Sequence, residues 1–514
     1  MERRRDWFLR GFVCLRSCVS VYLVVFSVLV LGACALKASP RSPGVDITIL
    51  HLNDVYEITP VSGGKEGGLS RVATLRRQLF EKNRNTFTVL AGDLLSPSAL
   101  GTAPVGNGNE SLDGRQIVAV MNAMGLTYAT FGNHEFDLKR ESFLERLRES
   151  RFIWFSSNVR DAEGRPFPGV ADTVVFEAAG ESGSPVRVGL IGVTIDSNRK
   201  PYVSYKDPVE TVKAKVKELR DRVDVLVAVT HLSLEQDTRL ASEVPGLDLI
   251  LGGHEHDNFQ IRRGPNFTPI YRADANVRSV YVHDLHFDRQ TRNLQVVSRF
   301  RAVDDTIPED PETERVVRYW RDLGYEGFRK EGFDPEEIVA KSEEPLDGLE
   351  ASVRNRPTRL TELIAQGMLA AVPEADAAIF NSGSVRIDDV LQPGEITVYD
   401  VIRIMPFGGK VLSVNMKGSL LKRVLDRGRS NRGTGGYLQM VNIRLDATGW
   451  VVNEEAIDEE RLYRIAVNDF LLSGNEQGLE FLNRDNKDLT ETGEHGDMRK
   501  ALIAQLQRSF GWGR

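Results

Sequence analysis

One short stretch, residues 132–137, places a carboxamide, an imidazole and a carboxylate close together in Asn133, His134 and Asp137. It follows the strand-like run 126–131, and a buried strand would deliver these side chains to a cleft. The alternative is an ordinary turn, in which Asn133 caps the next helix and His134 is a satisfied surface side chain. Taken alone, the stretch fits either interpretation.

Other stretches repeat this arrangement, because Asp54, Asp93, His254 and His256 also follow apolar runs directly. His231 ends a further β-branched run. In α/β sheets, sites assemble at the carboxyl ends of the strands. We therefore expect these side chains to converge on one cleft, which favours a site over a turn.

The elements that would position these residues alternate along the chain from about residue 45 to 300. Short apolar or β-branched runs, which we expect to be strands, cover residues 45–50, 86–91, 127–131, 187–194, 223–230 and 247–251. Polar stretches, which we expect to be helices, cover residues 70–82, 116–124, 141–149 and 208–220. Such alternation predicts a layered α/β domain.

The length of 514 residues exceeds the size at which one hydrophobic core stops growing, so we expect two domains. Residues 304–349 are rich in charge and proline and contain an amphipathic segment, 312–323, which indicates a linker helix. We place a catalytic domain at 45–303 and a second α/β domain at 350–514, with the boundary near residue 340. Signals of the second domain are helices at 360–371 and 416–427 and a strand at 377–380.

Residues 1–36 form a segment apart, in which arginines precede an apolar run at 19–31 and then Cys34. This order is typical of a secretion leader, and residues 31–34 resemble a bacterial lipoprotein processing box in which Cys34 would be lipidated. Simple cleavage and an uncleaved anchor are the alternatives, although the run is shorter than the about 20 residues of a membrane span. We predict export to the periplasm or cell envelope with a lipid anchor.

Composition excludes some classes of function. All three cysteines lie in the first 34 residues, so the rest of the chain has neither thiol chemistry nor disulfides. A formal charge of −7 argues against non-specific nucleic-acid binding, which depends on lysine and arginine neutralising phosphates. An anionic small-molecule substrate would have to be met by metal ions or by a few arginines.

Hard divalent cations such as Zn, Mn, Mg or Ca take carboxylate, carboxamide and imidazole ligands, and a two-metal site needs a carboxylate that bridges ions about 3.5 to 4 Å apart. The side chains that supply this set are Asp54, Asp93, Asn133, His231, His254 and His256. Two metal ions held by them would polarise a phosphoryl group and activate a water. The chemistry indicated is metal-dependent hydrolysis of phosphate esters.

The ordered blocks 50–54, 92–93, 132–137, His231 and 252–256 resemble the calcineurin-like metallophosphoesterases, and more narrowly the exported 5'-nucleotidase and UDP-sugar hydrolase family. The resemblance implies a layered metallophosphoesterase sandwich followed by a second α/β substrate-binding domain. It also implies the metal roles: Asp54 and His256 would bind the first ion, Asp93 would bridge, and Asn133, His231 and His254 would bind the second.

In that family His134 would stabilise or protonate the leaving group while Asp137 orients its imidazole. The residues themselves agree, because a histidine paired with a carboxylate three residues away suits a general acid. Asp137 as a helix N-cap is an equal alternative that does not exclude this role.

Tyr56 departs from the family pattern, which usually reads Asp-x-His in the first block. One interpretation is that Tyr56 points away as a core aromatic. The other is that its phenol ligates a metal, which would favour ferric iron.

The second domain carries two further blocks of this resemblance. Residues 381–386 resemble the Asn-Gly-Gly-x-x-Arg block, and residues 406–409 resemble the Pro-Phe-Gly block. By resemblance, Asn381 would bind the base or sugar and Phe407 would stack on a base, which gives about 1 to 3 kcal/mol. The phosphate would meet guanidinium groups, namely Arg386 with Arg354 or Arg356.

Leu479 is a departure, because it stands where the family has a second stacking aromatic; Phe481 or Phe470 would have to compensate. A core phenylalanine at a turn is the alternative for Phe407. Of the other histidines, we expect His51 in the core and His283, His286 and His495 at the surface.

The predicted function is hydrolysis of phosphate esters, in the first place a 5'-nucleotidase-like release of phosphate from nucleotides. Alternatives with the same fold are a phosphodiesterase, a UDP-sugar pyrophosphatase and a sulfur-ester hydrolase. An inactive binding protein is an alternative from another class.

Overall fold

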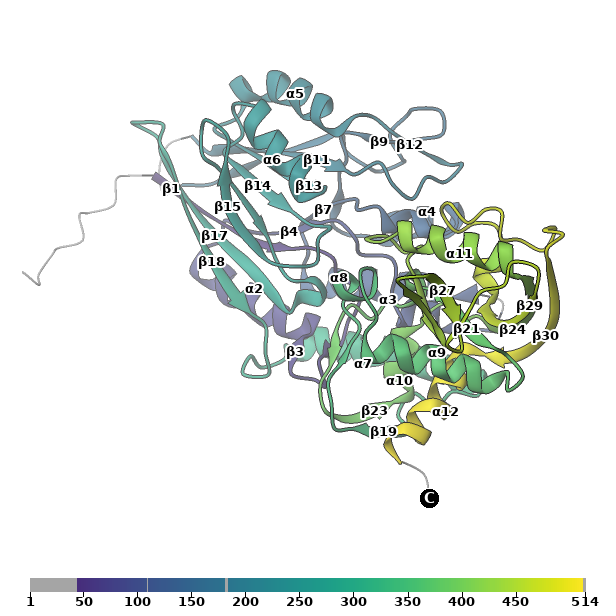
Figure 1. Ribbon diagram of the computed structural model, residues 1–514. Coiled ribbons are helices and arrows are strands. Elements are labelled where there is room, and N and C mark those ends of the chain that lie inside the picture. The colour runs from purple at the N-terminus through teal and green to yellow at the C-terminus, as the bar shows by residue number, and fades with distance from the viewer. Residues whose placement is uncertain (1–43, 109, 181–183, 512–514) are drawn as a thin grey trace, which may run out of the picture.

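The computed structural model describes residues 44–108, 110–180 and 184–511 (Figure 1). The predicted secretion leader, including Cys34, lies outside these residues. Within the described ranges, no helix has the length and apolar character needed to cross a bilayer.

Two six-stranded sheets form the centre of the N-terminal half. In spatial order, the first contains β18 (Leu294–Ala302), β17 (Ser279–Asp288), β1 (Gly44–Leu52), β4 (Thr86–Ala91), β7 (Tyr128–Thr130) and β8 (Ile153–Trp154). The second contains β10 (Thr173–Ala178), β11 (Val186–Thr194), β13 (Val225–His231), β14 (Leu249–Gly252), β16 (Thr268–Arg272) and β15 (Phe259–Arg263). In each sheet four neighbouring strands run parallel, and antiparallel pairing occurs at the β17–β18 edge of the first sheet and at both edges of the second.

The sheets pack face to face through β-branched side chains. Ile47, Ile49 and Val89 of the first sheet share one buried cluster with Val188 and Val227 of the second. Because side chains alternate across a strand, the opposite faces are apolar as well and must be covered by helices. The sheet positions that the sequence predicted as strands therefore belong to a sandwich with a helical layer on each side.

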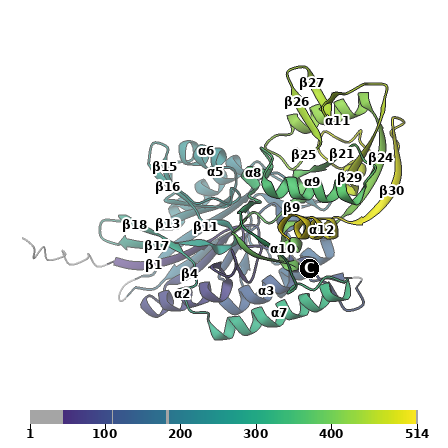
Figure 2. The same ribbon diagram turned by 60° about the horizontal axis from the view of Figure 1, so that its bottom comes forward.

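The helical layers lie on opposite sides of the sheets (Figure 2). One layer contains α2 (Leu69–Lys82), α3 (Arg115–Met124), α4 (Arg140–Glu149) and α7 (Pro311–Lys330). The other contains α5 (Pro208–Leu219) and α6 (Leu234–Glu243). Helix α7 begins at Pro311 after Asp310, whose carboxylate accepts the Thr313 N–H at 3.0 Å and so caps the helix.

The C-terminal half is a second α/β unit. Its five-stranded sheet has the order β25 (Leu438–Val441), β21 (Ala377–Asn381), β29 (Leu462–Asn468), β24 (Lys410–Lys417) and β30 (Leu489–Asp497). Helix α11 (Gly418–Ser430) packs on one face of this sheet. The other face is covered by α9 (Arg359–Ala371), α12 (Met498–Phe510) and α10 (Val398–Ile404). The predicted fold class, a layered α/β sandwich followed by a second α/β domain, is confirmed.

The remaining strands are short. They form the pairs β2 (Pro60–Val61) with β3 (Glu66–Gly67), β5 (Pro104–Val105) with β6 (Glu110–Ser111), β9 (Val159–Asp161) with β12 (Val203–Tyr205), β19 (Ile338–Ser342) with β23 (Gly394–Thr397), and β20 (Leu346–Asp347) with β22 (Val390–Leu391). A separate hairpin ladder contains β26 (Ile443–Asp446), β27 (Gly449–Val452) and β28 (Glu455–Ala456).

The two halves touch through buried polar groups. The Tyr399 hydroxyl of α10 donates to Glu57 Oε2 at 2.9 Å, and Ser62 Oγ donates to Asp389 Oδ1 at 3.3 Å. Helix α7 packs on α2 and α3, whereas β19 already pairs with β23. The chain therefore passes from one half to the other between residues 331 and 337.

Candidate metal centre

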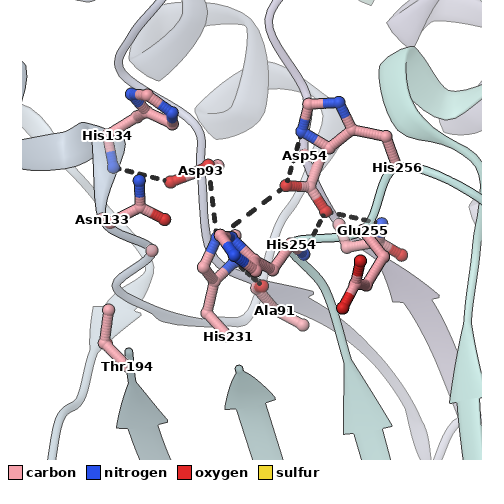
Figure 3. A network of polar contacts seen from close by, with 12 residues as sticks. Asp54, Ala91, Asp93, Asn133, His134, Thr194, His231, His254, Glu255 and His256 are labelled. Carbon is pink, nitrogen blue, oxygen red and sulfur yellow. Dashed lines mark hydrogen bonds and ion pairs between the residues drawn. The ribbon is translucent and has the colours of Figure 1, made fainter. Parts of the chain in front are cut away.

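The predicted metal ligands meet at the carboxyl ends of parallel strands from both sheets (Figure 3). Asp54 follows β1, Asp93 follows β4, and His231 is the last residue of β13. Asn133 follows β7, and both His254 and His256 follow β14. The residues expected to converge therefore do so.

Asp54, Asp93 and His231 form the centre of this group. One ligand atom from each lies within 4.8 Å of the others, and all three residues are buried. The His231 Nδ1–H donates to the Ala91 carbonyl at 2.9 Å, which turns Nε2 to within 3.2 Å of Asp93 Oδ2. Burial alone would raise the pKa of Asp54, but the neighbouring imidazoles of His231 and His256 outweigh it and lower this pKa.

Asn133 Oδ1 is buried and lacks a hydrogen-bond partner, and His231 Nε2 has the Asp93 carboxylate as its neighbour but satisfies no hydrogen-bond geometry. Buried polar atoms are normally satisfied, and buried carboxylates need a compensating positive charge. A divalent cation would satisfy both atoms and both carboxylates, and the donor set of carboxylate, carboxamide and imidazole matches its preferences. The residues therefore fit a metal centre.

The backbone around the centre is strained in a way that is typical of functional sites. Four non-glycine residues of the group have left-handed φ angles: Asp54 (51°), Asp93 (57°), His254 (85°) and His256 (59°). The strand ends also approach closely, since a Cβ on Gly253 would lie 2.4 Å from the Ala91 carbonyl oxygen. Only glycine fits between β4 and β14 at this point.

Glu135 holds two of the ligand loops together. Its buried carboxylate accepts the N–H groups of Gly132 at 2.6 Å, Leu94 at 2.5 Å and Asp93 at 3.2 Å. Burial and the neighbouring Asp93 raise the pKa of Glu135 to about 7. No sequence pattern indicates this role, because two of the three partners are backbone groups of a loop about 40 positions away.

His134 and Asp137 are paired, as predicted. They lie in the 3-10 turn η2 (His134–Asp137), where His134 Nδ1–H donates to Asp137 Oδ2 at 2.7 Å. Burial opposes protonation of His134, but the carboxylates of Asp137 and Asp93 outweigh it and raise the pKa. Asn198 donates to Asp137 Oδ1 at 2.9 Å, a contact that no sequence pattern indicates.

The alternative roles of these residues as caps are wrong. The residue that precedes α4 is Lys139, so Asp137 does not cap that helix. Asn133 precedes η2, but its side chain makes no capping hydrogen bond there.

Tyr56 points into the centre, so its interpretation as a core aromatic pointing away is wrong. Its hydroxyl donates to Asp93 Oδ2 at 2.9 Å and lies 3.1 Å from His256 Nε2. Burial, Asp93 and Asp54 together raise the pKa of the phenol well above its usual value.

Arginines of the C-terminal half face the centre. Arg386 lines a hollow of about 10 Å³ together with Tyr56, His134 and His256. Arg354 forms an ion pair with Glu350 and lines an adjoining cavity of about 320 Å³. Arg356 does not join them, because it pairs with Asp347 at 2.9 Å on the outside.

Asn381 is buried within a polar network rather than open to solvent. Its Oδ1 accepts from Ser384 Oγ at 2.8 Å and from Asn468 Nδ2 at 2.9 Å. The network ties the 381–386 block to the end of β29.

Phe407 is exposed, which contradicts its interpretation as a core phenylalanine. The side chain is 57% exposed, and the Arg386 guanidinium lies 5.8 Å from its ring centroid. It lines a cavity of about 720 Å³ that also borders Asp137 and Arg499.

Leu479 is fully buried in the core of the C-terminal half and cannot stack on a ligand. Of the two aromatic replacements, Phe481 packs against that core, and the Arg423 guanidinium lies 3.8 Å from its ring centroid. Phe470 is 43% exposed and is adjacent to Asp469, which lies against Gly409. Of the two, Phe470 is therefore the more exposed aromatic, in a segment that lies against the loop of Phe407.

The other histidines are placed differently from one another. His51 is buried, as expected, and its Nε2–H donates to the Gly252 carbonyl at 3.1 Å. His283 is also fully buried, so its expected surface position is wrong; tyrosines of β16 and β17 surround its ring. His286 and His495 are half-buried.

Comparison with known proteins agrees with this arrangement. Residues 47–258 match the family described as calcineurin-like phosphoesterase, and residues 338–484 match the 5'-nucleotidase, C-terminal domain. The chain therefore contains a calcineurin-like phosphoesterase domain followed by a 5'-nucleotidase C-terminal domain. The calcineurin-like phosphoesterases are hydrolases that bind divalent metal ions.

Individual relatives are distant. This phosphoesterase is 26% identical to the trifunctional nucleotide phosphoesterase protein YfkN of Bacillus subtilis over 85% of its own length and 32% of that protein. It is 25% identical to human 5'-nucleotidase, with 79% of this chain and 76% of the relative covered. The fold matches the 5'-nucleotidase precursor of Thermus thermophilus with a TM-score of 0.71 at 23% identity, covering 90% of this chain and 97% of that one.

Proposed function

We propose that this chain releases phosphate from nucleotides by metal-dependent hydrolysis, with two divalent ions held by the predicted ligands. The observation that carries the proposal is the meeting of two buried aspartates, a buried histidine and the unpartnered Asn133 Oδ1 at the strand ends. This donor set lies beside the His134–Asp137 pair.

Divalent ions bound there would polarise the phosphoryl group and lower the pKa of the attacking water. The protein side chains would do the rest. Arg386 and Arg354 would hold the phosphate oxygens, which suits the fork of a guanidinium. His134 would protonate the departing oxygen through Nε2, because Nδ1 is already bound to Asp137.

Nucleotides are the proposed substrate class for two reasons. Relatives of similar length are named 5'-nucleotidases. In addition, the exposed Phe407 borders a cavity of about 720 Å³ next to Asp137, where the leaving group would lie. Phe470 would supply the second stacking surface in place of the buried Leu479.

A substrate panel with elemental analysis tests this proposal. We expect bound divalent metal and turnover of AMP and UMP above that of cyclic AMP, UDP-glucose and p-nitrophenyl phosphate. Inactivity on AMP together with turnover of diesters would reject the nucleotidase assignment. If the protein binds less than one metal ion and Asn133→Ala changes no activity, the chain is a binding protein and not an enzyme.

Tyr56 provides a separate test of which metal is bound. If the phenol ligates ferric iron, the purified protein will show an intense visible charge-transfer band that disappears in Tyr56→Phe. A colourless active enzyme would exclude this ligation and leave Tyr56 as a hydrogen-bond donor to Asp93.

Export and domain division are also proposals. We propose that residues 1–36 direct export and that Cys34 carries a lipid anchor; Cys34→Ser should then release the protein from the membrane fraction of cells. The catalytic domain would cover residues 45–303, the linker helix 304–349 and the substrate domain 350–514.

A further inference from the structure

Asp388 of the C-terminal half contacts a predicted metal ligand of the N-terminal half. Its Oδ2 accepts the Nδ1–H of His256 at 2.6 Å, and its Oδ1 accepts the Glu350 N–H at 2.7 Å. Both carboxylate oxygens are thus engaged. Asp388 is buried and has a left-handed φ of 40°, a backbone conformation that is found more often at functional sites.

The contact determines how the His256 ring is oriented. With Nδ1 bound to Asp388, the ring directs Nε2 toward the centre, 3.1 Å from the Tyr56 hydroxyl and 3.4 Å from Asp54 Oδ1. A carboxylate bound to the far nitrogen of a metal-binding histidine fixes its tautomer and orientation. Asp388 stands in that relation to His256.

His231 provides a contrast within the same centre. Its far nitrogen is bound by the Ala91 carbonyl, at the end of β4 in the first sheet of the same half. His231 is therefore oriented within the N-terminal half, whereas His256 depends on a residue from the other half.

The segment that carries Asp388 is fixed to the rest of the protein next to this contact. Its neighbour Asp389 pairs with Arg403 at 3.2 Å and accepts from Ser62 of the N-terminal half at 3.3 Å. Asp388 is thus presented to His256 by a buried junction between the halves.

We propose that Asp388 is a positioning residue that completes the first metal site from the second domain, so that metal affinity at His256 depends on contact between the two halves. The proposal rests on the ligand role of His256 in the proposed function. Coupling of this kind is reciprocal, so a metal ion bound at His256 would also favour contact between the two halves.

Metal titration of the full chain tests the proposal without any substrate. Metal-stripped wild type and Asp388→Ala would be titrated with Mn²⁺ by isothermal calorimetry, with circular dichroism and a melting curve to confirm folding. We expect Asp388→Ala to weaken one of the two binding events by about 10- to 100-fold, the range found when such supporting carboxylates are lost. Asp388→Asn, which keeps an acceptor oxygen, should weaken it less.

Asp426→Ala is the matched control, because Asp426 accepts from Trp450 at 2.7 Å within the C-terminal half and does not contact His256. It should bind Mn²⁺ as the wild type does. Equal weakening in Asp388→Ala and Asp426→Ala would overturn the proposal, as would unchanged affinity in Asp388→Ala.

A double-mutant cycle with His256→Ala separates positioning from general support. If Asp388 acts through His256, Asp388→Ala will change Mn²⁺ affinity less than about twofold in the His256→Ala background. The same loss in both backgrounds would contradict the proposal. Because phosphate release is not measured, an inactive chain with this metal behaviour would refute only the proposed function.

Discussion

His134 lies beside the predicted metal ligands, and its Nδ1 is already bound to Asp137. Its contribution to the rate should therefore depend on how much the leaving group needs a proton. Replacement by alanine should lower kcat on AMP by about 10² to 10⁴-fold, the usual contribution of a general acid. The loss should be much smaller on p-nitrophenyl phosphate, whose leaving group departs without a proton. Steady-state kinetics on both substrates measure the difference.

The control for this variant is His495→Ala, which removes a half-buried histidine bound to Ser413 in the C-terminal half. Its kinetics should match the wild type. An equal loss on both substrates in His134→Ala would show that His134 acts on something other than the departing oxygen.

At the level of residues, the sequence predicted the groups whose chemistry is visible in a single side chain. The predicted ligands and the His134–Asp137 pair come together because each directly follows a strand or ends one. Glu135, Asn198 and Asp388 were missed, since their importance comes from partners 40 or more positions away, including the 132-position separation of Asp388 from His256. The orientation of Tyr56 depends on the turn after β1, which no local pattern predicts.

The junction of β4 and β14 leads to a prediction for the strand ends. Gly253→Ala would place a Cβ 2.4 Å from the Ala91 carbonyl oxygen and 3.0 Å from Asp54 Oδ2, so β14 or the Asp54 loop must move. We expect the purified variant to lose bound metal and activity. Elemental analysis measures this.

Gly493→Ala is the corresponding control in β30, where the nearest atom to a new Cβ belongs to the His495 side chain at 3.2 Å, which can move aside. It should retain wild-type metal content. Full metal occupancy in Gly253→Ala would show that the strand ends tolerate separation.

The buried His283 on β17 should make stability depend on pH. Burial and the neighbouring His51 hold its pKa well below 6.5, so the folded state leaves it neutral while the unfolded state binds a proton below about pH 6.5. The stability that the neutral, buried His283 contributes at neutral pH is therefore lost as the pH falls below the pKa of this histidine in the unfolded state.

Replacing His283 by leucine removes this proton-linked loss. The melting temperature of His283→Leu should fall less between about pH 8 and pH 5 than that of the wild type, even if it starts lower. Melting curves at several pH values measure the slopes. Parallel slopes would mean that other groups govern the acid sensitivity.

At the level of elements, the sequence pattern predicts the parallel strands β1, β4, β7, β11, β13 and β14, whose apolar runs are continuous, but not the inner strands β16, β17, β24 and β29. The edge strand β18 was missed because one of its faces is exposed and carries arginines and glutamine, so its sequence lacks a strong apolar signal. The helix expected at 416–427 begins later, at Gly418, because Met416 and Lys417 pair with β29 at the end of β24. Strand pairing overrides the local helical preference there.

At the scale of the whole molecule, Tyr399 and Glu57 join the two halves. Tyr399→Phe would remove one of the hydrogen-bond donors to the buried Glu57 carboxylate, which costs about 1 to 3 kcal/mol. We expect a lower melting temperature and a larger radius of gyration by small-angle scattering. Tyr319→Phe on the exposed face of α7 is the control and should change neither quantity.

The hollow between the two halves has a consequence for the rate of turnover. At about 10 Å³ it holds at most a single water, so a phosphate ester could enter this hollow only if His256 and Asp388 moved apart. If the substrate binds there, every turnover would include one separation and one approach of the halves against solvent drag. For a fast substrate, kcat should fall as sucrose raises the viscosity, whereas a slow substrate limited by chemistry should show no change.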